Sequence, residues 1–196
     1  MQSETWSPRE RMVYSAAQLL RARGATATGI RDVVARAGAP RGSFQHYFPG
    51  GKDQLVGEAL EWAGGFAERR AASYPATTDD PTPAGLFAHM VEGWKAEFTA
   101  RGFERGCPVM ATAADLAGGD SAVNGHVRAA LEGWGHAVAA ELARMGVPAG
   151  RADALATLMI SALEGAIMWA RIRRDAGPLE TVVTELAPLL DSAARP

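Results

Sequence analysis

The spacing of apolar residues along the chain is that of α-helices. Apolar side chains recur every three or four positions, which places them on one face of a helix, and no segment alternates apolar and polar residues as a half-buried strand does. The pattern therefore predicts an all-α protein of about nine helices. They are expected at 8–23, 30–37, from Pro40, from Lys52, and at 87–98, 109–116, 127–142, 152–174 and 179–193.

Capping and turn residues mark the ends of these helices. Residues 7–10, Ser-Pro-Arg-Glu, form a capping box with proline at the first helical position, and Gly24 is placed to close the helix that they start. The stretch 74–83 holds three prolines, two aspartates and three threonines, so it is predicted to be a loop. Gly177-Pro178 separates the last two helices.

Residues 28–53, TGIRDVVARAGAPRGSFQHYFPGGKD, have the layout of a helix-turn-helix that reads DNA. Gly38 permits a sharp turn, and Pro40 is expected to be the first residue of the second helix. Phe44 and Phe48 lie four positions apart and are predicted to face inward. The opposite face then offers polar side chains to the major groove: Arg41, Ser43, Gln45 and His46.

Charge is divided unevenly along the chain. Residues 1–52 carry eight lysines or arginines and three acids, a balance of +5. Because the formal net charge of the whole chain is −2, the other 144 residues carry −7. A basic N-terminal segment followed by an acidic body favours nucleic-acid binding by the first segment.

The composition excludes several classes of protein. With 196 residues and 47% hydrophobic content, the chain can bury a sizeable core, which excludes a disordered or fibrous protein. One cysteine excludes an intramolecular disulfide, and the four histidines lack metal-ligand spacing, so no metal or cofactor is expected. We find neither a membrane-length apolar run nor a signal-peptide layout, and expect a cytoplasmic protein without membrane association.

Residues 8–60 closely resemble the DNA-binding end of TetR-family repressors. Two motifs are similar to the branch that includes the LmrA and YxaF regulators: residues 48–52, Phe-Pro-Gly-Gly-Lys, and 106–109, Gly-Cys-Pro-Val. Val34 stands where such motifs prefer alanine, and Pro40 replaces the usual hydroxyl or acidic cap. The resemblance implies a homodimeric repressor in which residues 1–52 bind palindromic operator DNA, while residues 53–196 bind an effector and the second subunit.

The resemblance also implies roles for residues of the second helix. It places Arg41, Gln45 and His46 on the side of the major groove. It places Ser43 and Tyr47 at phosphates, and packing of Tyr47 on the first helix is the alternative. The Arg41 guanidinium can donate to guanine O6 and N7 together, a contact worth about 1–3 kcal/mol of discrimination against other base pairs.

Helix starts supply further candidate phosphate contacts. Thr28 and Gly29 open one predicted helix and Lys52 opens another, so each brings backbone N–H groups and a partial positive charge. The candidate DNA-binding residues are therefore Thr28, Gly29, Arg41, Gly42, Ser43, Gln45, His46, Tyr47 and Lys52.

The remainder of the chain is rich in large aromatic and thioether side chains. They suit an aromatic-lined cavity, since methionine repacks around varied ligands and flat rings give broad contact; an ordinary core is the alternative. Glu164 interrupts the apolar run 158–170 and is a candidate to orient a ligand or meet a partner helix, or else to lie partly exposed. The candidate residues for a small, largely apolar or aromatic effector are Trp62, Phe66, Trp94, Phe98, Met110, Trp134, Met159, Glu164 and Met168.

The last two helices are expected to join two copies of the chain. The apolar positions 179, 182, 183, 186 and 190 repeat at helical spacing and offer a face for a contact between subunits. Cys107, between glycine and proline, is expected to be a small structural residue rather than a redox sensor, because no basic cluster surrounds it in the sequence.

Two other functions stay open at this point. One is a DNA-binding regulator of the same fold that responds to a protein or to nothing. The other is a helical module that does not bind DNA. An enzyme is not indicated, since no serine lies in a Gly-x-Ser-x-Gly elbow.

Overall fold

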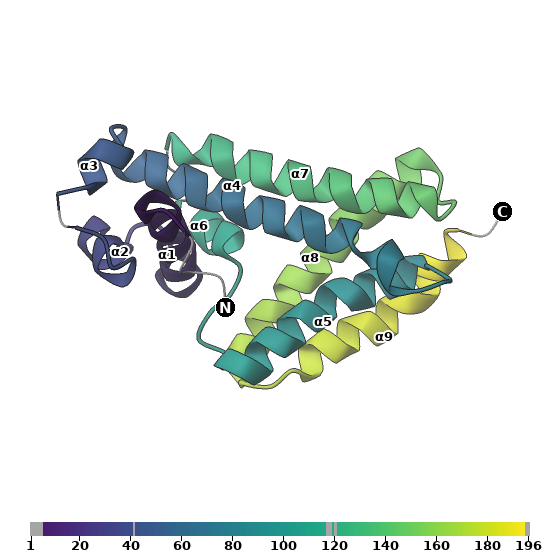
Figure 1. Ribbon diagram of the computed structural model, residues 1–196. Helices are drawn as coiled ribbons and strands as arrows, with labels where there is room; N and C mark the ends of the chain where they lie inside the picture. The colour runs from purple at the N-terminus through teal and green to yellow at the C-terminus, as the bar shows by residue number, and fades with distance from the viewer. Residues whose placement is uncertain (1–5, 41, 117–118, 120, 195–196) are drawn as a thin grey trace. The chain divides into compact units, whose positions relative to one another are not determined.

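The computed structural model describes residues 6–40, 42–116, 119 and 121–194, and within them it is built of helices with no β-strand (Figure 1). The all-α prediction is confirmed. The helices are α1 (Pro8–Arg23), α2 (Ile30–Arg36), α3 (Phe44–Tyr47), α4 (Gly51–Ala72), a 3-10 turn (Tyr74–Thr77), α5 (Pro83–Arg101), α6 (Pro108–Leu116), α7 (Val123–Arg144), α8 (Ala149–Arg173) and α9 (Gly177–Ser192).

Local capping starts and ends α1 as the sequence predicts. The Ser7 hydroxyl accepts from the Glu10 backbone N–H at 3.3 Å, and the Glu10 carboxylate accepts from the Ser7 N–H at 2.7 Å. Gly24 follows the helix with φ of 74°, a left-handed conformation that favours glycine. These contacts satisfy backbone groups that the helix ends leave without partners.

The start of α3 differs from the prediction. The helix begins at Phe44, not at Pro40, and contains only four residues. The Ser43 N–H donates to the Pro40 carbonyl at 3.0 Å, and the Ser43 hydroxyl donates to the same oxygen at 2.7 Å. Pro40 therefore belongs to the turn before the helix, because its carbonyl is engaged in a local turn.

The chain packs as two compact units. Unit 1 comprises residues 1–65 and 107–131, and unit 2 comprises residues 66–106 and 132–196. This division of packing differs from the functional boundary expected at residue 52, because α6 and the first part of α7 pack with the N-terminal helices. Both α4 and α7 contribute residues to both units.

Unit 1 is organised around α1, which α2 and α6 contact. Met12, Ala16 and Leu20 on α1 are fully buried. Val33 of α2 and Phe48 after α3 are also fully buried. Helices as short as α2 and α3 are unstable alone in water, so this shared core holds them in place.

Unit 2 is built from α5, α8 and α9, which lie side by side in Figure 1, with the second part of α7. Phe87 on α5, Leu142 on α7 and Leu163 on α8 are buried in its core. Leu179 and Leu190 at the two ends of α9 are fully buried in the same core.

The face of α9 that the sequence assigned to a second subunit packs against the core of its own chain, and a contact of this face with a second subunit stays a prediction. Leu179 and Leu190 are buried, and Val182, Val183 and Leu186 pack against the same core. Other positions on α8 and α9 carry the exposed large apolar side chains, because the most regular apolar face of α9 packs on the core of unit 2. On these two helices they are Leu158, Met168, Trp169, Ile172 and Leu189.

In the described residues, α8 is long and apolar enough to cross a membrane by length and composition alone. The expectation that no such run exists was therefore wrong by this criterion. Leu155, Met159 and Leu163 of this helix lie in the core of unit 2. Packing within the protein thus explains the apolar residues on the buried side of α8.

A histidine joins the start of α5 to the end of α4 within unit 2. His89 Nε2 lies 3.1 Å from the Arg70 carbonyl oxygen and 3.3 Å from the Ser73 hydroxyl. Its ring packs on that of Tyr74 at 5.6 Å between centroids. Burial, and then the nearby Arg70 guanidinium, lower the pKa of His89 below its ordinary value of 6.5.

We expect His89 to make the protein less stable as the solution becomes acidic. Since its pKa is lower in the folded state, the unfolded chain binds the proton first as pH falls below about 6.5. Urea unfolding between about pH 5 and pH 8 should show a stability difference between wild type and His89→Gln that grows with rising pH and levels off above about pH 6.5. Parallel stability curves for the two proteins would contradict this.

Candidate nucleic-acid interface

The turn between α2 and α3 has the geometry of a helix-turn-helix within unit 1. Gly38 has φ of 59°, which allows the chain to turn sharply after α2. Phe44 and Phe48 are buried and their rings stack at 5.3 Å between centroids, so their predicted inward orientation is confirmed. Val34, in place of the usual alanine, is buried as well.

The opposite side of α3 is open to solvent. Gly42, Gln45 and His46 are exposed, and the Gln45 side-chain amide donates to the Pro49 carbonyl at 3.3 Å. Arg41, the predicted guanine contact, lies outside the described residues. The structure thus brings two of the three predicted groove residues to one exposed surface, and their contact with bases stays a prediction.

The two predicted phosphate ligands of this region are less exposed. Ser43 is half-buried and its hydroxyl donates to the Pro40 carbonyl. Tyr47 is also half-buried, with the His46 ring packed edge-on at 5.0 Å between centroids. A phosphate would have to replace or share the bond that Ser43 makes.

The start of α2 presents backbone rather than a side chain. Thr28 is buried, and its hydroxyl donates to the Gly24 carbonyl at 2.7 Å, so the side chain shapes the turn. Gly29 is the N-cap of α2 and provides no side-chain cap. Any phosphate contact here would therefore use backbone N–H groups.

Lys52 lies in the first turn of α4 and is bonded to the turn before α2. Its Nζ donates to the Thr26 carbonyl oxygen at 3.1 Å. The bond places a cation beside the residues that lead into Thr28 and Gly29. This hydrogen bond therefore links the start of α4 to the turn that precedes α2.

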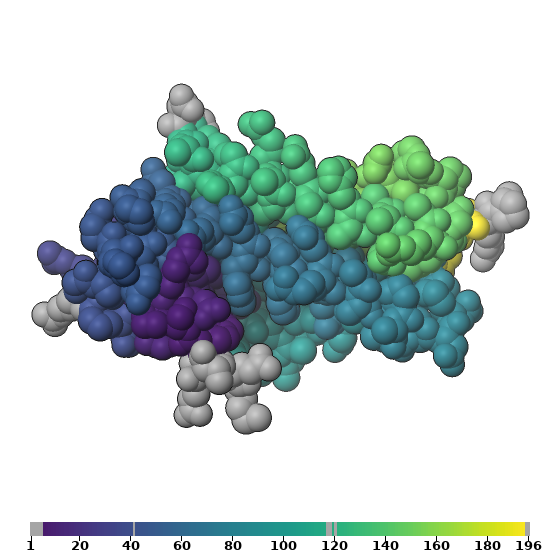
Figure 2. Space-filling view, turned by 45° about the horizontal axis from the view of Figure 1, so that its top comes forward, coloured from purple at the N-terminus to yellow at the C-terminus, as the bar shows by residue number. Residues whose placement is uncertain are grey.

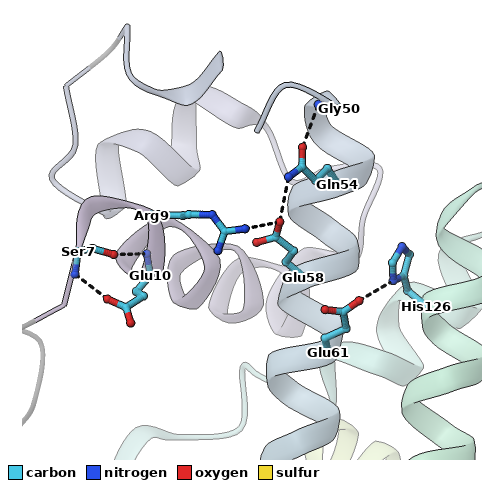
Figure 3. Close-up of polar contacts among 8 residues, drawn as sticks. All are labelled: Ser7, Arg9, Glu10, Gly50, Gln54, Glu58, Glu61 and His126. Atoms are coloured by element: carbon cyan, nitrogen blue, oxygen red, sulfur yellow. Dashed lines mark hydrogen bonds and ion pairs between the residues drawn. The ribbon is translucent and has the colours of Figure 1, made fainter. Parts of the chain in front are cut away.

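A polar network fixes the start of α4 against α1 (Figure 3). Arg9 donates to the Glu58 carboxylate at 2.7 Å, and Gln54 donates to the same oxygen at 3.0 Å. The Gln54 side-chain carbonyl in turn accepts from the Gly50 backbone N–H at 2.9 Å. Sequence reasoning missed this network, because nothing local shows that Arg9, 49 positions before Glu58, is the partner of that carboxylate.

The N-terminal helices form one continuous surface, purple to dark blue in Figure 2. Arg31 and Arg36 on α2 are exposed on this unit, whereas Arg23 is paired with Asp32 at 2.8 Å. Arg31 and Arg36 thus leave basic side chains of residues 1–52 at the surface, which suits a polyanion.

The candidate effector residues are divided between the two units. Trp62 and Met110 belong to unit 1, and the other seven belong to unit 2. Within unit 2, the buried candidates are Phe98, Trp134, Met159 and Glu164, and Trp94 is half-buried. Phe66, Met110 and Met168 are exposed, and ligand binding by the nine candidates stays a prediction.

Comparison with known proteins identifies the family. Residues 14–59 match the family described as "Bacterial regulatory proteins, tetR family", and residues 83–185 match the "Transcriptional regulator LmrA/YxaF-like, C-terminal domain". The chain belongs to the TetR family of transcriptional regulators. The TetR family consists of regulators rather than enzymes, and the suspected LmrA/YxaF-like branch is confirmed.

Relatives of this TetR-family chain match it over nearly the full length. The HTH-type transcriptional regulator Rv0196 of Mycobacterium tuberculosis is 39% identical over 192 residues, covering 93% of this chain and 94% of the relative. YxaF of Bacillus subtilis is 30% identical over 183 residues, with coverages of 93% and 94%. LmrA of the same organism is 26% identical, with coverages of 93% and 96%.

Solved structures of TetR regulators share the fold. A regulator from Legionella pneumophila has a TM-score of 0.82 at 16% identity, covering 95% of this chain and 99% of that one. One from Chloroflexus aurantiacus has a TM-score of 0.73 at 29% identity, with both chains 92% covered. The similarity at 16% identity shows the fold alone.

Proposed function

We propose that this TetR-family regulator is a cytoplasmic repressor that binds a palindromic operator as a homodimer and is released by a small, largely apolar effector. The observation that carries the proposal is the exposed polar side of α3, flanked by the starts of α2 and α4. Gln45 and His46 face solvent there, while Lys52 stands next to the α2 turn. As the second helix of a helix-turn-helix, α3 is suited in this position to enter the major groove of DNA.

The DNA-binding residues divide into two kinds by position. Those on α3 can reach base edges, which differ between base pairs in the major groove. Lys52 and the backbone at Gly29 lie at helix starts, which suit contacts to phosphate, and phosphate carries no direct sequence information. Specificity and general affinity should therefore depend on different residues.

We expect Arg41→Ala to weaken operator binding by about 1–3 kcal/mol and to relax preference at one base pair per half-site. Lys52→Ala should weaken binding to all duplexes alike and reduce the salt dependence. Competition binding with DNA from upstream of the protein's own gene, and with point-mutated and random duplexes, measures both effects. Equal losses on specific and random DNA for Arg41→Ala would exclude base readout.

The homodimer is supported by the exposed apolar side chains of α8. TetR-family regulators bind operator DNA as homodimers. Met168 is 52% exposed, Trp169 56% and Ile172 76%, at the helical spacing of one outer stripe. Large exposed apolar patches mark interaction sites, and Leu158 and Leu189 are exposed apolar residues as well.

We expect Trp169→Glu to convert the dimer to a monomer, since a carboxylate buried in an apolar contact between subunits loses its hydration. Sedimentation equilibrium at micromolar concentration should then give the chain mass of 20.6 kDa. Ala140→Glu, an exposed site on α7, is the matched control and should stay dimeric. A wild-type monomer, or a dimer unaffected by Trp169→Glu, would contradict this interface.

The effector proposal concerns unit 2. Trp94 packs on Phe98 at 5.9 Å between ring centroids, and Phe98 stacks on Phe103 at 4.8 Å. Among the described residues, buried Trp134 Nε1 has no hydrogen-bond partner. An N–H group in that situation favours a ligand with a hydrogen-bond acceptor, because a buried unsatisfied donor is costly.

We expect Trp94→Ala to reduce the response to aromatic ligands while operator affinity stays near wild type, since unit 1 is unchanged. Trp134→Phe should weaken only ligands that carry an acceptor, by about tenfold, because it removes one N–H and keeps most of the ring area. Tryptophan fluorescence with a panel of aromatic compounds, paired with gel shifts, measures both. Lost DNA binding with an unchanged ligand response would show that these residues are only core.

A further inference from the structure

A carboxylate on α6 is bonded to the turn that leads into the helix-turn-helix. Asp115 Oδ2 accepts a hydrogen bond from the Thr26 backbone N–H at 2.5 Å, although the two residues are 89 positions apart. Both residues lie in unit 1. The bond ties α6 directly to the segment between α1 and α2.

The position of Asp115 is unfavourable for α6 itself. It is the penultimate residue of the helix, where the helix dipole disfavours a negative charge. The bonds from Thr26 lower the pKa of the Asp115 carboxyl below its ordinary value, and the field of Lys52 acts in the same direction. The contact with the turn thus offsets the cost to the helix, because hydrogen bonds to an ionised acceptor are strong.

The turn is shaped to let this carboxylate approach. Gly24 has φ of 74°, and a Cβ there would lie 3.0–3.2 Å from three atoms of the Asp115 side chain. A larger residue at Gly24 would therefore be strained and would also push Asp115 away. This close approach is a second observation, independent of the hydrogen bond, that the turn and α6 fit each other.

The backbone of Thr26, in the turn between α1 and α2, is bonded to both α6 and α4. Its N–H is held by Asp115, and its carbonyl accepts from Lys52 Nζ at 3.1 Å. Two residues later, Thr28 donates its hydroxyl to the Gly24 carbonyl and leads into α2. The position of Thr26 consequently sets where the α2 start and Lys52 lie relative to each other.

We propose that Asp115 is a positioning residue for DNA binding, which holds the α1–α2 turn so that the α2 start and Lys52 meet the DNA backbone together. The proposal rests on the DNA-binding function proposed above. The charge of Asp115 opposes phosphate, so its contribution comes from position rather than from attraction. Because α6 is the first helix after the chain re-enters unit 1 at Cys107, a shift of α6 would reach the DNA-binding turn through this carboxylate.

Three variants separate position from charge. Asp115→Ala removes the acceptor and the charge, and Asp115→Asn removes the charge but keeps an oxygen acceptor. Asp53→Asn is the matched control: Asp53 is exposed, adjoins Lys52 in the first turn of α4, and is not among the groups that hold the α1–α2 turn. The readout is the affinity for the operator duplex and for a random duplex, because loss of a negative charge alone strengthens binding to both, whereas misplaced phosphate contacts weaken binding to both.

We expect the affinity for both duplexes to fall by about tenfold for Asp115→Ala and by less for Asp115→Asn, and not to fall for Asp53→Asn. Amide hydrogen exchange at Thr26 should accelerate only in the Asp115 variants, with the thermal midpoint as the check on folding. If the alanine variant does not fold, Asp115→Asn is compared with Asp53→Asn in the same assay.

Two results would overturn the inference. Affinities of the folded Asp115 variants equal to those of wild type would show that the bond does not position the turn. Equal gains in affinity for Asp115→Asn and Asp53→Asn would reduce its effect to charge. In both cases wild-type DNA binding, and with it the proposed function, would stand; a wild-type chain that binds no duplex would overturn both.

Discussion

The burial of α1 is the constraint on which the DNA-binding unit depends. Met12, Ala16 and Leu20 are fully excluded from solvent, and α2 and α6 contact the same helix. Burying a large apolar side chain contributes about 1.5–3 kcal/mol, whereas a helix of the length of α2 or α3 is unstable alone in water. The recognition elements are therefore stable only as part of the core that α1 supplies.

Polar contacts decide the geometry of this unit more than its stability. Exposed ion pairs such as that between Arg9 and Glu58 contribute about 0–1 kcal/mol each. Their importance lies in direction, since Arg9 and Gln54 fix the first turn of α4, and Asp115 fixes the turn before α2. Small energies are sufficient for this, because the apolar core already holds the helices close together.

In unit 2, the single helix α8 contributes residues both to the core and to the outer surface. Leu155, Met159 and Leu163 of α8 are buried in the unit, while Met168 and Trp169 point out of it. An apolar residue on one helix thus belongs to a core or to an outer surface according to its angular position. Hydropathy alone cannot separate these cases, which is why α8 also meets the composition of a membrane-spanning helix.

The sequence by itself determined what depends on neighbours along the chain. The helical periodicity, the capping box at Ser7 and Glu10, and the inward pair Phe44 and Phe48 each involve residues three or four positions apart. The family resemblance rests on motifs of the same local kind. These features could be predicted because the interactions that produce them occur within one or two helical turns.

Only the tertiary structure decided which helix faces meet. It assigned α6 to the DNA-binding unit, turned the regular apolar face of α9 inward, and placed Asp115 against Thr26. Pro40 shows the same limit at short range, since its carbonyl is engaged by Ser43 before the helix begins. Such outcomes depend on contacts between residues far apart in the sequence, or on competition between local structures, and no spacing pattern encodes either one.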